Sequence, residues 1–356
     1  MITTRRHLLQ GAAAAAAAAT LAPRTPAQDS PPQDDSDPYG GHTHRGPAVI
    51  ASGNGTSAVA RAYELIQAGT DALDATVAGV TIVENDPKDM SVGYGGLPNE
   101  EGVVQLDASV MHGPSHRAGA VGAIERIKNP AQVALAVLKR TDHVMIVGDG
   151  ARRFAVAQGF KEEDLLTEEA RKAWLRWKAR LNPNDDWLDP DQQLDTPGEL
   201  EIPYTTGTIH CSGVSPSGDM GAVTTTSGLS WKIPGRVGDS PLIGAGMFCD
   251  NAVGSAGATG RGEAVIQNCG AFSVVRAMED GLSPTDACLH VLERIASRTR
   301  RPYLLNAKGE PNFNVSLYAL RKDGAWGAAC MRPGGSFAID DGNKARRISC
   351  VSLFQD

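Results

Sequence analysis

The segment Thr206-Gly207-Thr208-Ile209 follows a long stretch rich in Asp and Pro, and it begins an apolar, strand-like run. A threonine here becomes a nucleophile with its own base if the peptide bond before it breaks, because it then carries a free α-amine. That amine has an ordinary pKa of about 7.7–8.0, far closer to neutrality than that of a lysine. It can accept the proton of the threonine's own hydroxyl. Thr208 is therefore a candidate nucleophile, with Gly207–Thr208 as the bond to be cleaved.

Downstream residues supply the other groups that acyl transfer needs, namely an orienting hydrogen bond and a polarised carbonyl. Thr226 lies in the run 224–228 and can hydrogen-bond the amine or hydroxyl of Thr208. Thr259 and Gly260 can bind an oxyanion through a hydroxyl and a backbone N–H, because a glycine lets the backbone approach closely.

Arg236 and Asp239 form a second pair, suited to the head group of a free amino acid. A guanidinium grips a carboxylate with two hydrogen bonds, and a carboxylate accepts from an ammonium group. Taken singly, each candidate has an ordinary explanation: a threonine packs in a strand, and an Arg–Asp pair marks a surface turn. Their joint occurrence at this spacing favours a hydrolytic site.

The N-terminus is typical of an export signal. Thr4-Arg5-Arg6-His7 precedes an alanine-rich apolar stretch from Gly11 to Ala22, and small residues near Ala27 suit cleavage. We interpret residues 1–27 as a twin-arginine signal peptide; an ordinary secretory signal is the alternative. The apolar stretch is too short and too rich in alanine for a transmembrane helix. We expect a periplasmic or secreted protein that leaves the membrane once the signal is removed.

The composition of the chain limits the classes of molecule that it is expected to bind. The chain has 356 residues, a formal charge of −7 and 21% charged residues, so nothing points to nucleic acid or to an anionic membrane. The cysteines lack zinc-type spacing, and the glycine-rich turn 93–96 lacks the Lys of a phosphate loop. We expect a small-molecule substrate and no metal or cofactor. Cys330 and Cys350 are candidates for a disulfide, with six buried thiols as the alternative.

The chain divides into two halves of one domain. Residues 28–46 are polar and proline-rich and predict a disordered tether, 47–207 form the first half, 181–203 predict a flexible linker, and 208–356 form the second half. Strands are predicted at 47–52, 103–110, 118–127, 144–147 (buried), 208–214, 220–225, 245–249, 314–320 and 325–331, and helices at 57–67, 70–86, 130–140, 161–178, 263–278 and 284–297. Because strands and helices come in blocks, two antiparallel sheets packed together with helices outside satisfy this order.

The second half resembles the β-subunit of the glycosylasparaginases, which are N-terminal nucleophile hydrolases. The resemblance rests on Thr208-Ile209, on the strings 225–228 and 258–263, and above all on the glycine-, arginine- and aspartate-containing string 235–246. The first half resembles the α-subunit in its strings 72–75, 91–96, 106–108, 127–130 and 147–150. Together the similarity extends from Pro47 to Cys330.

This resemblance implies an α+β fold, a four-layer αββα sandwich, and self-cleavage between Gly207 and Thr208 by an N-to-O acyl shift. It implies that Thr208 is the nucleophile and Thr226 its support, that Arg236 and Asp239 hold the substrate, and that Thr259 and Gly260 form the oxyanion hole. The implied reaction is hydrolysis of the side-chain amide of N4-(β-N-acetylglucosaminyl)-L-asparagine. The implied assembly is a homodimer of cleaved protomers.

Two residues depart from the glycosylasparaginase pattern. The residue before the nucleophile is aspartate in that branch but Gly207 here, as in plant-type asparaginases and isoaspartyl peptidases. A tryptophan of the substrate pocket is replaced by Gly53. A plant-type L-asparaginase or isoaspartyl peptidase is therefore one alternative, and an unprocessed amino-acid-binding protein is another. The chain has no Gly-x-Ser-x-Gly elbow, which disfavours a serine hydrolase.

Overall fold

Strand β5 (Thr206–Val214) lies inside a mostly antiparallel sheet of order β12-β11-β1-β5-β6-β2-β3-β4. The structure is a computed structural model and describes residues 46–181 and 206–355, which belong to one compact unit, 36–356. Among the described residues of this sheet, β3 and β4 are the one parallel pair, and all other neighbouring strands are antiparallel. Its other strands are β1 (Ala48–Ser52), β2 (Gln105–His112), β3 (Arg117–Glu125), β4 (Met145–Val147), β6 (Met220–Leu229), β11 (Ser336–Asp340) and β12 (Arg346–Ser349).

A second sheet packs against the first. Its order is β13-β10-β9-β8-β7, antiparallel except where β13 pairs with β10. These strands are β7 (Met247–Asp250), β8 (Gly254–Gly260), β9 (Val315–Arg321), β10 (Trp326–Cys330) and β13 (Val351–Ser352). Side chains of both sheets, among them Ile50, Met220 and Trp326, form one buried apolar cluster between them.

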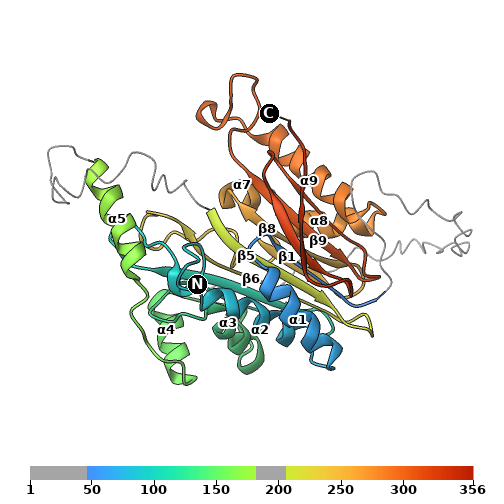
Figure 1. Cartoon of the computed structure of the whole chain (residues 1–356), viewed down its shortest axis with the longest axis horizontal. Helices are drawn as coiled ribbons and strands as arrows, with labels where there is room; N and C mark the ends of the chain where they lie inside the picture. Colours follow the sequence, from blue (N-terminus) through green and yellow to red (C-terminus); the bar gives the residue numbers. More distant parts are fainter. Residues whose placement is uncertain (1–45, 182–205, 356) are drawn as a thin grey trace, which may run out of the picture. The chain divides into compact units, whose positions relative to one another are not determined.

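Helices cover the two outer faces, with α1, α2 and α3 on the first sheet and α8 and α9 on the second (Figure 1). Each face has its own apolar core, which contains Leu73 and Val110 on the first side and Val274 and Leu292 on the second. The helices are α1 (Thr56–Gln67), α2 (Ala72–Glu84), α3 (Pro130–Arg140), α4 (Gly148–Ala157), α5 (Glu168–Leu181), α7 (Gly262–Ile266), α8 (Gly270–Glu279) and α9 (Pro284–Arg298), with short 3-10 turns η1 (Gly93–Gly95) and η2 (Pro302–Leu304). Three cores separate four layers, which confirms the expected αββα sandwich.

The apolar pattern of β1 explains why it lies between two cores. Side chains alternate across a strand, so Val49 and Ala51 pack among the helices while Ala48 and Ile50 face the second sheet. A strand buried on both faces reads as a continuous apolar run, and this is the run that the sequence shows at 47–52.

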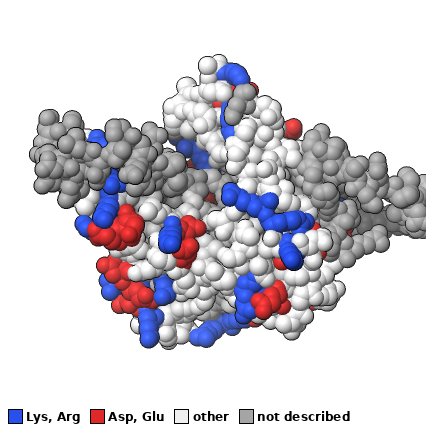
Figure 2. Space-filling model, viewed as in Figure 1, with Lys and Arg blue, Asp and Glu red and all other residues white. Residues whose placement is uncertain are grey.

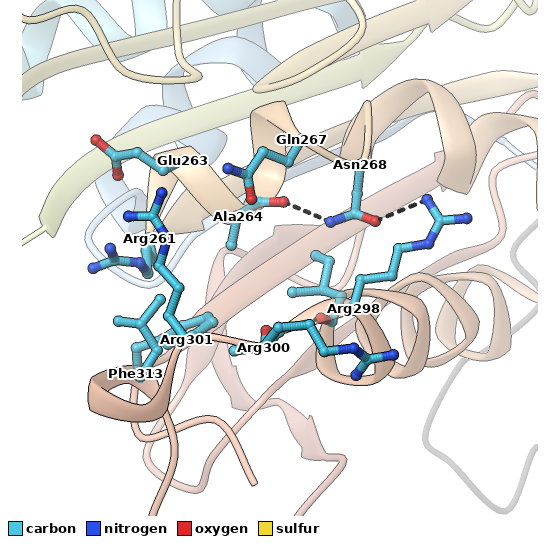
Figure 3. Close-up of a pocket in the computed structure, with 12 residues that line it drawn as sticks. Arg261, Glu263, Ala264, Gln267, Asn268, Arg298, Arg300, Arg301 and Phe313 are labelled. Carbon is cyan, nitrogen blue, oxygen red and sulfur yellow. Dashed lines mark hydrogen bonds between the residues drawn. The ribbon is translucent and has the colours of Figure 1, made fainter.

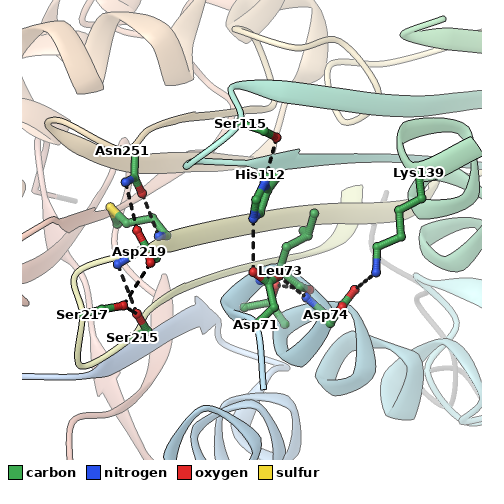
Figure 4. Close-up of polar contacts among 12 residues, drawn as sticks. Asp71, Leu73, Asp74, His112, Ser115, Lys139, Ser215, Ser217, Asp219 and Asn251 are labelled. Carbon is green, nitrogen blue, oxygen red and sulfur yellow. Dashed lines mark hydrogen bonds and ion pairs between the residues drawn. The ribbon is translucent and has the colours of Figure 1, made fainter. Parts of the chain in front are cut away.

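Polar contacts fix the start of α2 next to the end of strand β2 (Figure 4). Asp71 caps the helix by accepting hydrogen bonds from the backbone N–H groups of Leu73 and Asp74 at 2.9 and 3.2 Å. Its other oxygen lies 3.1 Å from Nε2 of His112, the last residue of β2. Asp74 also pairs with Lys139 of α3. These contacts hold α2 in register on the strands that carry the site.

Several predicted elements differ from the observed ones. The predicted buried strand 144–147 is shorter, and Val147 is exposed because β4 is an edge strand. The predicted helix 161–178 begins only at Glu168. The helix predicted at 263–278 is two helices, broken where Cys269 adopts a left-handed conformation with φ of 48°. Helix α4 and strands β8, β11, β12 and β13 were not predicted. Strand β8 consists of Gly, Ser, Ala and Thr, and the other three strands are short and of mixed polarity, so none of these strands has a clear period.

The surface over α4 and α5 carries neighbouring acidic and basic side chains (Figure 2). They include the ion pairs Arg152–Asp149 and Arg171–Glu168, both within one helical turn. Among residues 46–181 and 206–355, no helix combines the length and apolar character that crossing a bilayer requires. The predicted signal peptide, the tether up to residue 45 and the linker from residue 182 lie outside the described residues.

Candidate active site

The bond between Gly207 and Thr208 lies at an irregularity in the pairing of β5 with β6. Gly207 pairs with Gly228 and Thr208 pairs with Thr226, so Ser227 has no partner across the strand. Such a bulge inserts one extra residue and locally increases the twist. Gly228 has a φ of 73°, a conformation that a glycine adopts without strain. The bulge therefore marks the peptide bond that the sequence singled out.

The Thr226 hydroxyl stands at the centre of the hydrogen bonds around this bond. It accepts from Thr208 Oγ1 at 3.0 Å and from the backbone N–H of Gly228 at 2.8 Å. It donates to the carbonyl oxygen of Gly207 at 2.5 Å. Thr226 thus contacts both the predicted nucleophile and the carbonyl that this nucleophile would attack. Its side chain is buried, so water does not compete for these bonds.

Gly207 packs against the loop 89–91 so closely that no side chain fits. A Cβ added at Gly207 would lie 1.6 Å from Ser91 Cβ and 2.4 Å from Ser91 Oγ. The Ser91 hydroxyl in turn donates to Asp89. Ser227 binds the Ser91 carbonyl through both its N–H and its hydroxyl, each at 2.9 Å. Ser91, which Asp89 holds by this hydrogen bond, therefore occupies the space into which a residue-207 side chain would point.

A buried lysine supports the bulge from the other side. Lys232 Nζ donates to the carbonyl oxygens of Gln105 and Ser227 at 2.9 and 3.1 Å. Asp107 lies 3.9 Å away and is also buried. Burial lowers the pKa of Lys232 and raises that of Asp107, while the charge of each opposes the shift in the other. This ammonium group pins the extra residue of the bulge in place.

Residues of β1 and its following turn lie beside Thr208. The Ser52 hydroxyl lies 3.3 Å from the Thr208 carbonyl oxygen and accepts from the His210 backbone N–H at 3.2 Å. A Cβ at Gly53 would lie 2.3 Å from Ser336 Oγ, which also accepts a hydrogen bond from Arg347 Nε at 2.7 Å. Ser336 therefore fills the space next to Gly53.

Arg236 and Asp239 lie together, and a third residue joins them. Arg236 Nε and Nη2 donate to Glu263 Oε1 at 3.0 and 2.7 Å. Gly262 allows this approach, because a Cβ there would lie 2.6 Å from Asp239 Oδ1 and 3.3 Å from Arg236 Nη2. Burial favours a higher pKa for Glu263, but the hydrogen bond and charge of Arg236 outweigh it and lower that pKa.

The two carboxylates of this group have unused acceptors. Asp239 Oδ2 and Glu263 Oε2 are buried and lack a hydrogen-bond partner among the described residues. Burial raises the pKa of Asp239 to about 7, although the nearby Arg236 opposes the shift. A buried carboxylate without a partner is costly, so an incoming cationic donor would stabilise it. Such an environment favours the binding of an ammonium group.

Thr259 and Gly260 end β8 at the same place. Thr259 Oγ1 lies 2.9 Å from the hydroxyl of Tyr318, which is buried in the next strand and fixes the threonine rotamer. Gly260 has a φ of 111°, and a Cβ there would lie 2.4 Å from the Asn314 carbonyl oxygen. Only glycine suits this position, and its oxyanion role stays a prediction.

One small hollow brings most of the predicted residues together. Its walls include Thr208, Thr226, Arg236, Asp239 and Gly260, with a cavity volume of about 10 Å³. Gly207 and Thr259 are covalent neighbours of this lining and do not themselves line it. A space of this size holds about one water molecule, so in the uncleaved chain the site has no room for a substrate.

The sequence did not single out Ser52, Ser91, Lys232 or Glu263 as site residues. Ser91 and Glu263 do lie in the strings that carry the family resemblance, and this was the available signal. Nothing in their local sequence indicates that Ser91 fills the place of a residue-207 side chain or that Glu263 engages Arg236. Among the described residues, no group of three or more His, Cys, Asp or Glu side chains is arranged to hold a metal ion.

All six cysteines are free thiols in the structure. Cys330 and Cys350 are nevertheless neighbours, and a hydrogen bond from the Cys350 thiol lowers the pKa of Cys330. The disulfide that the sequence suggested would need this proximity, and the pairing stays a prediction.

Comparisons with known proteins agree with this geometry. Residues 50–344 match the family model described as asparaginase. The chain is 41% identical over 303 residues to N(4)-(Beta-N-acetylglucosaminyl)-L-asparaginase of Elizabethkingia miricola, covering 85% of this chain and 83% of that protein. It is 35% identical over 303 residues to the Mus musculus protein of the same name, covering 80% and 84%. A putative protein of that name from Drosophila yakuba is 36% identical over 309 residues, covering 80% and 75%.

Proposed function

This chain belongs to the asparaginase family and is an amidohydrolase, and from that premise we propose that it hydrolyses N4-(β-N-acetylglucosaminyl)-L-asparagine to aspartate and the amino sugar. The substrate is the one named for relatives that align with most of this chain. The observation that carries the proposal is the hydrogen-bond chain from Thr208 through Thr226 to the Gly207 carbonyl.

Self-cleavage comes first. Thr208 Oγ attacks the Gly207 carbonyl carbon, the peptide C–N bond breaks, and the hydroxyl proton ends on the Thr208 nitrogen. The Thr226 hydroxyl donates to the oxygen that becomes negative in this step, at 2.5 Å in the uncleaved chain. Water then hydrolyses the ester, which frees Thr208 with its α-amine and leaves Gly207 as a carboxylate. Departure of the Gly207 end enlarges the hollow so that a substrate can enter.

The same atoms then act on the substrate. The α-amine of Thr208 takes the proton of Oγ as Oγ attacks the side-chain amide carbon, and it passes the proton to the departing nitrogen. The Thr259 hydroxyl and the Gly260 N–H bind the oxyanion. The amino sugar leaves, and water hydrolyses the aspartyl ester to release aspartate and restore Thr208. No cofactor takes part in this scheme.

The substrate's head group is held by charge. Arg236 binds the α-carboxylate while Glu263 fixes the guanidinium. Asp239 accepts from the α-ammonium group, which gives its buried oxygen a partner. This arrangement favours a free asparagine derivative over an asparagine inside a polypeptide, because a polypeptide has neither charge there.

A second candidate is hydrolysis of asparagine itself or of β-aspartyl peptides, as in plant-type enzymes. Gly207 and Gly53 favour it, because Ser336 fills the space beside Gly53 and accepts a hydrogen bond from Arg347. A catalytically silent amino-acid-binding protein is a third candidate. It would use Arg236 and Asp239 without cleavage of the chain.

We also propose the biological setting that the N-terminus suggests. Residues 1–27 direct export through the twin-arginine route, and the mature protein acts in the periplasm or outside the cell as a homodimer of cleaved protomers. Mass spectrometry of the exported protein measures where the chain begins, and light scattering measures its assembly.

One experiment tests the proposal as a whole. The purified chain is followed on a denaturing gel, and the smaller fragment is sequenced from its N-terminus. We expect a fragment that begins Thr-Ile-His, and activity that appears in step with it. Rates on the sugar-linked asparagine, on asparagine and on a β-aspartyl dipeptide then separate the two hydrolase candidates. An intact chain that binds asparagine without hydrolysing it supports the binding protein instead.

A further inference from the structure

Four arginines surround a hollow next to the catalytic one (Figure 3). They are Arg261, Arg298, Arg300 and Arg301, and the hollow has a volume of about 330 Å³. Three segments meet there: the turn between β8 and α7, the end of α9 with the residues after it, and Phe313. The site described above uses none of these arginines.

Nearby carboxylates balance only part of the charge of this hollow, since the charge of Arg261 helps to lower the pKa of Glu263. Glu263 is the one acidic residue among its lining side chains, and its Oε1 already accepts two hydrogen bonds from Arg236. Within residues 46–181 and 206–355, no carboxylate lies within ion-pair distance of any of the four arginines. Their other contacts are with neutral groups: Arg298 donates to Asn268 at 3.4 Å, and Arg301 to the Tyr303 hydroxyl at 3.0 Å.

A structural role accounts for only part of the cluster. Arg298 is the last residue of α9, where a cation favours the helix dipole. The Arg261 guanidinium lies 5.5 Å from the centre of the Phe313 ring, a cation–π contact. Arg300 and Arg301 lie beyond the helix and gain neither benefit. Like charges placed around one hollow repel each other, and a bound anion would relieve that repulsion.

The hollow shares a wall with the catalytic site. Gly260 lines the catalytic hollow and Arg261 lines the second one. Glu263 lines the second hollow and binds Arg236 of the first. The second hollow's volume of about 330 Å³ is far larger than the volume of about 10 Å³ in the catalytic hollow, which holds about one water molecule. This is room for an oxyanion and part of the group that carries it.

We propose that this hollow, lined by Arg261, Arg298, Arg300 and Arg301, is an anion-binding subsite that takes a sulfate, phosphate or carboxylate group. Guanidinium groups bind such oxyanions with paired, charge-assisted hydrogen bonds. The anion is either a substituent of a substrate that extends past Glu263 or a free ion. Binding of a free ion does not depend on the proposed hydrolytic function, so the two ideas fail separately.

Calorimetric titration with sodium sulfate and sodium phosphate, at ionic strength held constant with sodium chloride, tests the subsite directly. We expect saturable binding by the parent protein. Arg300→Gln and Arg261→Gln should each weaken it about five- to tenfold, the loss of one charge-assisted hydrogen bond at a partly exposed site. Arg276→Gln is the matched control, because Arg276 is exposed on α8 and pairs with Glu279 away from the hollow. Thermal melts establish that each variant is folded.

Kinetics then identify the source of the anion. If it belongs to a substrate, an asparagine whose sugar carries a sulfate ester has a lower KM than the neutral one, and Arg300→Gln removes that advantage without changing kcat for the neutral substrate. If it is a free ion, sulfate binds and the two substrates have equal KM values. Both results support the subsite. Absence of saturable binding, or binding unchanged in both Arg300→Gln and Arg261→Gln, overturns it.

Discussion

Replacing Thr226 by valine removes one hydroxyl at the centre of the cleavage site and keeps the shape of the side chain. Three hydrogen bonds are lost: from Thr208 Oγ1, from the Gly228 N–H, and to the Gly207 carbonyl. Val is β-branched like Thr, so the strand conformation should persist. The variant therefore isolates the electrostatic contribution of the hydroxyl.

The cost to self-cleavage follows from the bond to Gly207. That carbonyl oxygen carries the negative charge in the tetrahedral intermediate, so Thr226 acts as an oxyanion donor in the first reaction. Losing one such donor typically raises the barrier by about 3 kcal/mol, which slows the step about 10²–10³-fold. The unpaired Gly228 N–H also costs about 1–3 kcal/mol of folding free energy. We expect a folded but far more slowly cleaved chain.

The assay is a time course on a denaturing gel, with intact mass spectrometry to identify both fragments. Thr226→Ser is the matched control, because it retains the hydroxyl and should cleave at a rate near that of the parent. Thr208→Ala sets the baseline without any cleavage. Cleavage of Thr226→Val at the parental rate, in protein that melts like the parent, would refute the assignment of Thr226 as the donor.

Three further predictions test the surroundings of this bond. Gly207→Ala should block cleavage or lower the soluble yield, because its Cβ would lie 1.6 Å from Ser91 Cβ. Adding Ser91→Gly to this variant should restore only part of the cleavage, because the Cα of residue 91 would still lie 2.7 Å from the new Cβ. Burial raises the pKa of Asp239 to about 7, and substrate binding requires its anion. The Thr208 α-amine must also be neutral. As the pH is lowered below about 7, log kcat/KM should therefore fall with a slope approaching two per pH unit. A slope of one over the whole range would show that Asp239 does not titrate with activity. Burial likewise raises the pKa of the Glu84 carboxyl group from 4.5 to about 7. The folded state therefore binds the Glu84 proton more tightly than the unfolded state does. The stability that this proton contributes is complete below pH 4.5 and is lost as the pH rises through 7. Urea unfolding of Glu84→Gln should lack this loss, on the order of 3 kcal/mol, between pH 5 and 7.5; a parent protein equally stable at both pH values would contradict the reasoning.

Regular, strongly patterned elements could be predicted from the sequence. The continuous apolar run of β1 and the 3.6-residue spacing of α2 match the structure closely. Helices 263–278 and 161–178 were misjudged because periodicity does not register a single left-handed residue such as Cys269, nor an irregular start before Glu168. The last strands were missed since their pairing with β1 and β10 depends on residues far away in the chain.

For the site, the sequence by itself determined the chemical identities. Threonine after a cleavable bond, glycine where φ is positive, and an Arg–Asp pair are local properties, readable from residue type and spacing. Which atoms meet was decided by the tertiary structure alone. The bulge opposite Gly207, the Ser91 side chain in the space beside Gly207, and the Glu263 contact to Arg236 each join segments from different strands and loops. Distances between such segments are set by how the two sheets and their helices pack, and no local pattern encodes that packing.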